Sequence, residues 1–117
     1  MVVVDDDESV RESLPDLLKE FGFKALVFSS AEEFLLSDSV DRARCLLLDI
    51  AMPGMSGLDL QKELKSRGYT IPIIFITAQK EESTRTRVLE QGAVGTLFKP
   101  FSDVDLRDAL NKAIGGG

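Results

Sequence analysis

Short apolar runs alternate along this chain with segments in which apolar residues recur every three or four positions. Uninterrupted apolar runs are typical of buried parallel strands, and they predict strands over residues 2–4, 24–28, 45–48, 71–76 and 94–98. The periodic segments predict amphipathic helices over residues 10–21, 30–36, 56–67, 82–91 and 102–113. Because strands and helices alternate strictly, we expect an α/β fold with a parallel sheet and helices on both faces.

Capping and turn residues agree with most of these boundaries. Gly22 follows the first periodic segment, where a glycine commonly ends a helix. Ser30 and Glu33 have the spacing of a capping box at the start of the second helix. Pro15 cannot donate a hydrogen bond within the first helix, so we expect a kink there. The polar residues 38–42 predict an irregular connection.

Length and composition predict one soluble domain. The 117 residues, of which 44% are hydrophobic and 29% charged, are enough for one core. We expect a folded domain over residues 1–114 and a flexible glycine end over 115–117. The sequence has neither an apolar run long enough to span a membrane nor a signal-peptide pattern, so we expect a cytoplasmic location without membrane contact.

The charge and the missing residue types exclude several functions. A net charge of −6 argues against direct binding of nucleic acid by this domain. The chain has no histidine, which excludes histidine zinc sites and Ser-His-Asp triads. Its single cysteine, Cys45, begins an apolar run and is expected to be a buried core residue.

Polar side chains with matching chemistry follow four of the predicted strands. In a parallel sheet the carboxyl ends of the strands meet at one edge, where open α/β sheets place their chemistry. This edge would gather Asp5, Asp6, Asp7, Asp49, Thr77 and Lys99. Oxygen ligands without cysteine or histidine favour a hard cation such as Mg²⁺. The lysine and the threonine suit a phosphoryl group, and Asp49 suits a nucleophile that forms an aspartyl phosphate.

Each of these residues also has an ordinary structural interpretation. Acidic residues after a strand often only complement the helix dipole, and Thr77 and Lys99 could be a cap and a solvated charge. Asp49 is harder to explain in this way, because it is one carboxylate directly after three leucines. The joint placement at four strand ends therefore favours a functional site.

Four motifs, in order along nearly the whole chain, resemble the receiver domain of two-component response regulators. They are Val3-Val4-Asp5-Asp6, the run Leu48-Asp49-Ile50-Ala51-Met52-Pro53-Gly54-Met55-Ser56-Gly57, Thr77-Ala78 and Lys99-Pro100-Phe101. The run from Met52 to Leu58 and the segment 71–78 look most similar to the FixJ-type subgroup. Members of that subgroup usually carry a C-terminal DNA-binding helix-turn-helix of the LuxR type.

The resemblance implies a flavodoxin-like (βα)5 fold with the strand order 2-1-3-4-5 and a metal-dependent phosphoacceptor. Asp49 would accept a phosphoryl group from the phosphohistidine of a sensor histidine kinase. Mg²⁺, or Mn²⁺ in its place, would be bound by Asp6, Asp49 and the backbone carbonyl of Ala51, and by Asp5 through water. The domain would not be an enzyme beyond its own phosphorylation and autodephosphorylation.

Further residues receive roles from the same resemblance. Thr77 would bind the acyl phosphate and shift on phosphorylation, Lys99 would pair with a phosphoryl oxygen, and the bond to Pro100 would be cis. The family's switch position usually holds Tyr or Phe, but here it holds Thr96, with Phe98 on the same strand face. We therefore expect signalling to depend more on the segment around 82–91, whose apolar stripe is sparse.

The output implied by the resemblance is a switch in an effector. Its surface would be formed by the helix 82–91, the strand 94–98 and the helix 102–113. This surface would support a homodimer or control a C-terminal DNA-binding domain, and so regulate transcription.

Three rival functions remain open on the sequence alone. A haloacid-dehalogenase-type phosphatase would also use a strand-end aspartate, but it needs a second aspartate at the position of Ala51. A flavin-binding module would need a phosphate loop after the first strand, where the acids of residues 5–7 would repel a phosphate. A receiver that acts as an unphosphorylated scaffold would not need the complete set of site residues.

Overall fold

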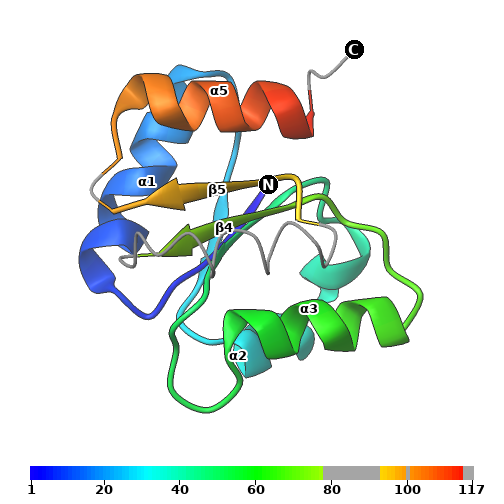
Figure 1. Ribbon diagram of the computed structural model, residues 1–117. Coiled ribbons are helices and arrows are strands. Elements are labelled where there is room, and N and C mark those ends of the chain that lie inside the picture. The colour runs from blue at the N-terminus through cyan, green and yellow to red at the C-terminus, as the bar shows by residue number, and fades with distance from the viewer. Residues whose placement is uncertain (78–92, 100, 115–117) are drawn as a thin grey trace.

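The computed structural model describes residues 1–77, 93–99 and 101–114, and its strands form one parallel sheet (Figure 1). Along the sheet the order is β2-β1-β3-β4-β5, which confirms the predicted flavodoxin-like order. The strands are β1 (Val2–Val4), β2 (Leu26–Phe28), β3 (Leu46–Asp49), β4 (Ile73–Thr77) and β5 (Gly95–Phe98).

Helices cover both faces of this sheet. Figure 1 shows α1 and α5 on one face and α2 and α3 on the other. Their bounds are α1 (Glu8–Glu20), α2 (Ala31–Leu35), α3 (Gly57–Ser66) and α5 (Asp103–Ala113). The predicted helix over 82–91 and the predicted glycine end over 115–117 lie outside the described residues. The helices that are described confirm the doubly wound arrangement.

The three central strands are buried from both sides. Because successive side chains of a strand point to opposite faces, the strand residues divide between two apolar clusters. The cluster beneath α2 and α3 contains Val2, Val4, Leu46, Leu48, Ile73 and Phe75. The cluster beneath α1 and α5 contains Val3, Cys45, Leu47, Ile74, Ile76 and Leu97. Cys45 is fully buried, as predicted, and burial raises the pKa of its thiol to about 11.

Several predicted boundaries are wrong by one or two residues, each for a local reason. β4 begins at Ile73 and not at residue 71, because Pro72 has no N–H to donate to a neighbouring strand. The Pro72 carbonyl still accepts a hydrogen bond from the Leu46 N–H at 2.9 Å. β3 includes Asp49 itself, so the carboxylate lies on the last residue of the strand and not beyond it.

The segment predicted as an irregular connection is ordered. Residues Asp38–Asp41 form a short 3-10 helix, η1, whose start is capped by the Ser37 side chain. Its one apolar residue, Val40, is buried in the cluster beneath α2 and α3. A single buried residue in a polar stretch gives no periodic signal, which explains why the sequence prediction missed this turn.

The capping predictions are mostly confirmed. The Ser30 side chain accepts a hydrogen bond from the Glu33 N–H, whereas the Glu33 carboxylate accepts from Ser29 and not from Ser30. Pro15 lies within α1, which continues through it to Glu20. The helix is therefore confirmed, and the expected kink stays a prediction.

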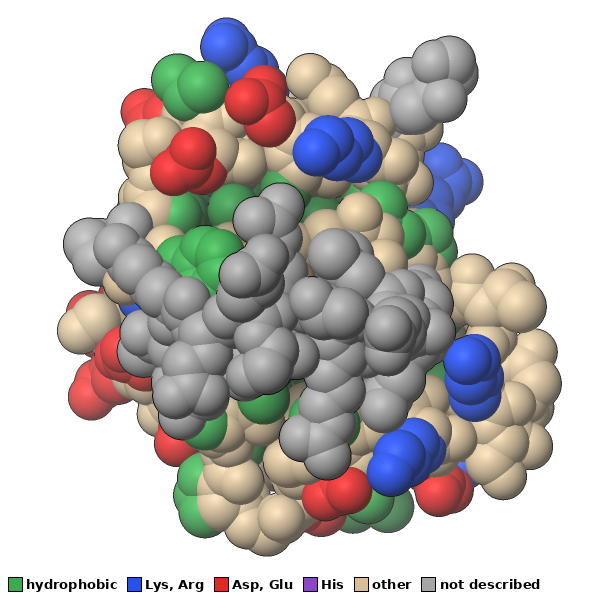
Figure 2. Space-filling view, viewed as in Figure 1, with side chains coloured by type: hydrophobic (Ala, Val, Ile, Leu, Met, Phe, Trp, Pro, Cys, Tyr) green, Lys and Arg blue, Asp and Glu red, His purple; other side chains and the backbone are tan. Residues whose placement is uncertain are grey.

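The outer surface carries charges of both signs. Figure 2 shows acidic and basic side chains together over α5, at the top of the view. No helix among the described residues is both long and apolar enough to cross a membrane.

We expect Gly57→Ala to lower the free energy of unfolding by about 1–3 kcal/mol, the usual cost of overpacking. A Cβ at Gly57 would collide with the Asp49 carbonyl oxygen and lie 2.9 Å from Ile50 Cα, and backbone atoms cannot move aside cheaply. Urea unfolding followed by circular dichroism measures the change. Gly95→Ala is the matched control, because no described atom lies within 4 Å of a Cβ there. Equal stability of the two variants would contradict this packing argument.

Candidate functional site

The carboxyl ends of the strands form the left edge of the sheet in Figure 1. Backbone hydrogen bonds continue beyond the strands and fix the residues that follow them. The Asp5 N–H donates to the Phe28 carbonyl at 3.1 Å, and the Lys99 N–H donates to the Thr77 carbonyl at 2.8 Å. These bonds place Asp5 and Lys99 at the same edge as Asp49, which ends β3.

Three carboxylates meet at this edge. One oxygen atom each of Asp5, Asp6 and Asp49 lies within 4.8 Å of the others. Asp5 is fully buried and Asp49 is 5% exposed, whereas Asp6 is open to solvent. Like charges at this separation repel strongly where little water can screen them. The cluster predicted from the sequence is therefore present, and it is under electrostatic strain.

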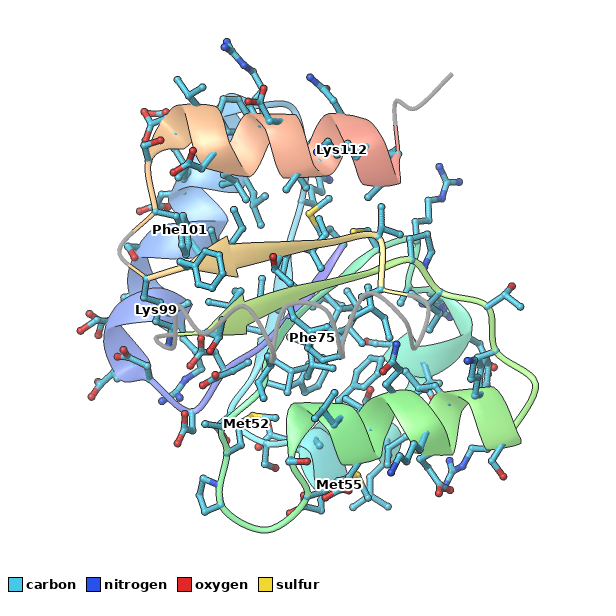
Figure 3. All side chains as sticks on the ribbon, viewed as in Figure 1. Met52, Met55, Phe75, Lys99, Phe101 and Lys112 are labelled. Carbon is cyan, nitrogen blue, oxygen red and sulfur yellow. The ribbon has the colours of Figure 1, made fainter. Side chains whose placement is uncertain are left out.

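The ammonium group of Lys99 faces this cluster. Its Nζ lies 3.2 Å from Asp5 Oδ2, 3.8 Å from Asp49 Oδ2 and 3.9 Å from Asp7 Oδ2. Figure 3 shows Lys99 where β5 ends, beside the acidic side chains. Burial works to lower the pKa of Lys99, but the charges of Asp5 and Asp49 outweigh it and raise that pKa. Lys99 is therefore a fixed positive charge at the site.

One ammonium does not neutralise the cluster, and Asp49 shows the consequence. Burial, followed by the charge of Asp5, raises the pKa of Asp49 to about 7, although Lys99 opposes the change. The Asp49 carboxyl therefore holds its proton to a higher pH than an ordinary aspartate. A further cation at the cluster would favour the charged form instead.

The donor set fits a hard divalent cation. Asp5 Oδ2 is buried without a hydrogen-bond partner among the described residues, although Lys99 Nζ lies near it. Oxygen ligands alone suit Mg²⁺, which usually takes one or two carboxylates and keeps several waters. The exposure of Asp6 and Ala51 leaves a side open for those waters.

The loop after β3 turns the chain back at the site. The Ala51 N–H donates to Asp49 Oδ1 at 3.3 Å, and the Gly57 N–H donates to the Ile50 carbonyl at 2.9 Å. Gly54 has a φ of +75°, a conformation that favours glycine in a turn. Figure 3 shows Met52 on this loop, and its side chain is buried against the core.

The predicted switch residues lie on β4 and β5, the last two strands in the order of the sheet. Thr77 ends β4 with 4% of its surface exposed and is paired in register with Phe98. Thr96 is paired with Phe75, and this pair lies two residues further from the carboxyl ends of the strands than Thr77 and Phe98. Thr96 and Phe98 therefore lie on the same face of β5, as predicted. Pro100, the predicted cis proline, lies outside the described residues.

Three contributors to the site received no role in the sequence analysis. Asp7, which received no role, caps α1 through the Ser9 N–H and lies near Lys99. Its position directly before a helix was a usable signal, because aspartate is a preferred cap. Gly57 permits the close approach of α3 to Asp49, and Glu32 contacts the loop from α2. Gly57 stands in the motif of residues 48–57, whereas Glu32 gives no signal in one sequence because its partner lies 23 positions away.

Comparison with known proteins points to one family. A family model described as the response regulator receiver domain matches residues 1–111. Nodulation protein W of Bradyrhizobium diazoefficiens is 45% identical over 108 residues, which cover 92% of this chain and 48% of that protein. Transcriptional regulatory protein FixJ of Azorhizobium caulinodans is 38% identical over 114 residues, covering 97% of this chain and 54% of FixJ. This chain thus spans about half the length of the curated relatives it matches.

Solved structures agree with this result. The response regulator StyR matches with a TM-score of 0.88 at 42% identity, covering 97% of this chain and 58% of that one. The structure titled FixJ-N matches with a TM-score of 0.84 at 35% identity, covering 96% and 90% of the two chains. Because the family model spans nearly the whole chain, this chain belongs to the response regulator receiver domains, the phosphoacceptor switches of two-component signalling.

Proposed function

We propose that Asp49 is the phosphoacceptor of this receiver domain and takes its phosphoryl group from the phosphohistidine of a sensor histidine kinase. The observation that carries the proposal is the environment of Asp49. It ends a buried strand, belongs to a cluster of three carboxylates and lies 3.8 Å from the Lys99 ammonium. A nucleophile beside a cation and a metal-binding cluster suits phosphoryl transfer, in which charge stabilisation supplies most of the catalysis.

The chemistry is a single displacement. An Asp49 carboxylate oxygen attacks the phosphorus atom as the bond to the imidazole nitrogen of the kinase breaks and that nitrogen keeps the electron pair. Lys99 pairs with a phosphoryl oxygen and offsets its charge, and the Thr77 hydroxyl binds another. Receiver domains are generally not catalytic enzymes, and we propose that self-catalysed phosphorylation and autodephosphorylation are the only reactions at this site.

We propose that Asp6, Asp49 and the Ala51 carbonyl bind the metal, with Asp5 acting through water. Mg²⁺, or Mn²⁺ in its place, supplies positive charge that offsets the charge of the transferring phosphoryl group. The buried oxygen of Asp5 and the net negative charge of the cluster support this assignment. The carboxylates at the site outnumber the one Lys99 ammonium, and this excess of negative charge suits a divalent ion.

We propose that the signal leaves the site through β4 and β5. Phe98 is the register partner of Thr77, so a shift of Thr77 reaches Phe98 first. Thr96 has no aromatic ring that could rotate in response to that shift, so the family's usual coupling is absent here. The segment 82–91, to which the sequence analysis gave this role, lies outside the described residues. The output surface formed by that segment, β5 and α5 then supports a homodimer or controls a C-terminal DNA-binding effector.

Incubation with acetyl phosphate and Mg²⁺ should add one phosphoryl group to the wild-type chain, detected by intact mass. Asp49→Asn should abolish the gain, because an amide cannot act as the nucleophile. Asp16→Asn, which removes an exposed carboxylate from α1, is the matched control and should be phosphorylated normally. A wild-type chain that gains no mass, or an Asp49→Asn variant that does, would refute the proposal.

The burial of Asp49 beside Asp5 predicts a pH-dependent stability difference between wild type and Asp49→Asn in chelator. The pKa of Asp49 rises from 3.8 to about 7 on folding, so the folded protein holds a proton that the unfolded chain has lost. Wild-type stability therefore falls as pH rises through this window. Between pH 5 and pH 8 the stability advantage of the Asp49→Asn variant should grow by about 2–3 kcal/mol, at about 1.4 kcal/mol for each unit of pKa.

Urea unfolding at several pH values measures this difference, with Asp16→Asn as a control that should track wild type. Mg²⁺ at pH 8 should stabilise the wild type more than Asp49→Asn, because it relieves the same repulsion. A stability advantage of Asp49→Asn that does not change with pH would contradict the raised pKa of Asp49.

A further inference from the structure

A single side chain from α2 holds the loop that follows Asp49. Glu32 Oε1 accepts a hydrogen bond from the Met55 N–H at 3.1 Å, between residues 23 positions apart in the sequence. A Cβ at Gly54 would lie 3.1 Å from Glu32 Oε2, so this oxygen lies directly beside the glycine Cα. The positive φ of Gly54 and its missing side chain together permit this approach. Figure 3 shows Met55 on the part of the loop beside α2 and the start of α3.

Other contacts described for this loop come from the strands, from α3 and from Met52, whose side chain is buried in the core cluster beneath α2 and α3. The Ile50 N–H donates to the Ile76 carbonyl of β4 at 3.1 Å, and the Gly57 N–H donates to the Ile50 carbonyl at 2.9 Å. These bonds fix the two ends of the loop. Glu32 fixes its middle, at the point where the chain reverses after Pro53.

The position of the middle of the loop matters because of Ala51. This residue binds the metal, in the function proposed above, through its backbone carbonyl. A backbone ligand has no side-chain rotamers, so only the conformation of the loop can place its oxygen. A loop that is free before binding must lose conformational entropy when the metal binds, and that cost weakens affinity. A contact that orders the loop in advance removes this cost.

We propose that Glu32 is a positioning residue for the metal site, which holds the loop after β3 so that the Ala51 carbonyl is available to the cation. The inference rests on the proposed function, since it concerns the metal of that site. The Glu32 side chain supplies the acceptor oxygen for the Met55 N–H, which an amide oxygen at the same place can also supply. Glu32 therefore connects α2, which supplies no ligand, to the affinity for Mg²⁺.

The test compares Glu32→Ala with Glu32→Gln, using Mg²⁺ alone and isothermal titration calorimetry. Glu32→Ala should weaken Mg²⁺ binding by about tenfold, the low end for residues that orient metal ligands. Glutamine keeps the acceptor oxygen, so Glu32→Gln should restore affinity to within about twofold of wild type. With acetyl phosphate, Glu32→Ala should need more Mg²⁺ for half-maximal rate but reach the same rate at saturation.

Glu33→Ala is the matched control, because it removes the same charge from the same turn of α2. The Glu33 carboxylate contacts only its neighbour Ser29 among the described residues and does not contact the loop. Mg²⁺ affinity should therefore stay close to wild type. In ¹⁵N–¹H spectra, the Met55 amide resonance should shift in Glu32→Ala and stay nearly unchanged in Glu32→Gln and Glu33→Ala.

The outcomes separate this inference from the proposed function. Wild-type affinity in Glu32→Ala would overturn the role of Glu32, and so would an equal loss in Glu33→Ala or in Glu32→Gln. In each of these cases wild type still binds Mg²⁺ and is phosphorylated, so the proposed function stands. A wild-type chain that neither binds Mg²⁺ nor gains a phosphoryl group would overturn the proposed function, and this inference with it.

Discussion

The repulsion between Asp5, Asp6 and Asp49 is the constraint on which the rest of the site depends. Three carboxylates lie within 4.8 Å of one another, and two of them are buried at the end of the sheet. Removing charge from water is costly unless an opposite charge is close. Lys99 supplies one positive charge, but burial and the charge of Asp5 still raise the pKa of Asp49. The site therefore favours the binding of a cation or a proton.

The order of the strands explains how Lys99 reaches the acids. Asp5 follows β1 and Lys99 follows β5, and in the sheet β3 and β4 lie between these two strands. Lysine has a long, flexible stem, and it crosses the ends of the intervening strands to place its Nζ 3.2 Å from Asp5. The ion pair thus joins the two halves of the sheet at the carboxyl edge. Asp49, at the end of β3 between them, lies 3.8 Å from the Lys99 Nζ.

The sequence predicted the sheet and the strand-end chemistry, because both depend on local patterns. The run Leu46–Leu48 followed by a carboxylate was sufficient to single out Asp49, and the strict alternation of elements brought the other strand ends to the same edge. The 3-10 turn at Val40 was missed, because a single apolar residue does not form a periodic pattern. The contact between Glu32 and Met55 was missed for a different reason. It joins two elements through space, and a single sequence does not record such pairs.

The loop after Asp49 connects the site to one face of the sheet, and Lys99 connects it to the other. α3 approaches through Gly57, whose N–H binds the Ile50 carbonyl, and α2 approaches through Glu32. Lys99 lies between β5 and the segment that leads into α5. In the proposed function, a phosphoryl group on Asp49 would lie between Lys99 on one side and the loop on the other. Because both supports meet at one carboxylate, a change at Asp49 could bias the conformation of both faces of the sheet.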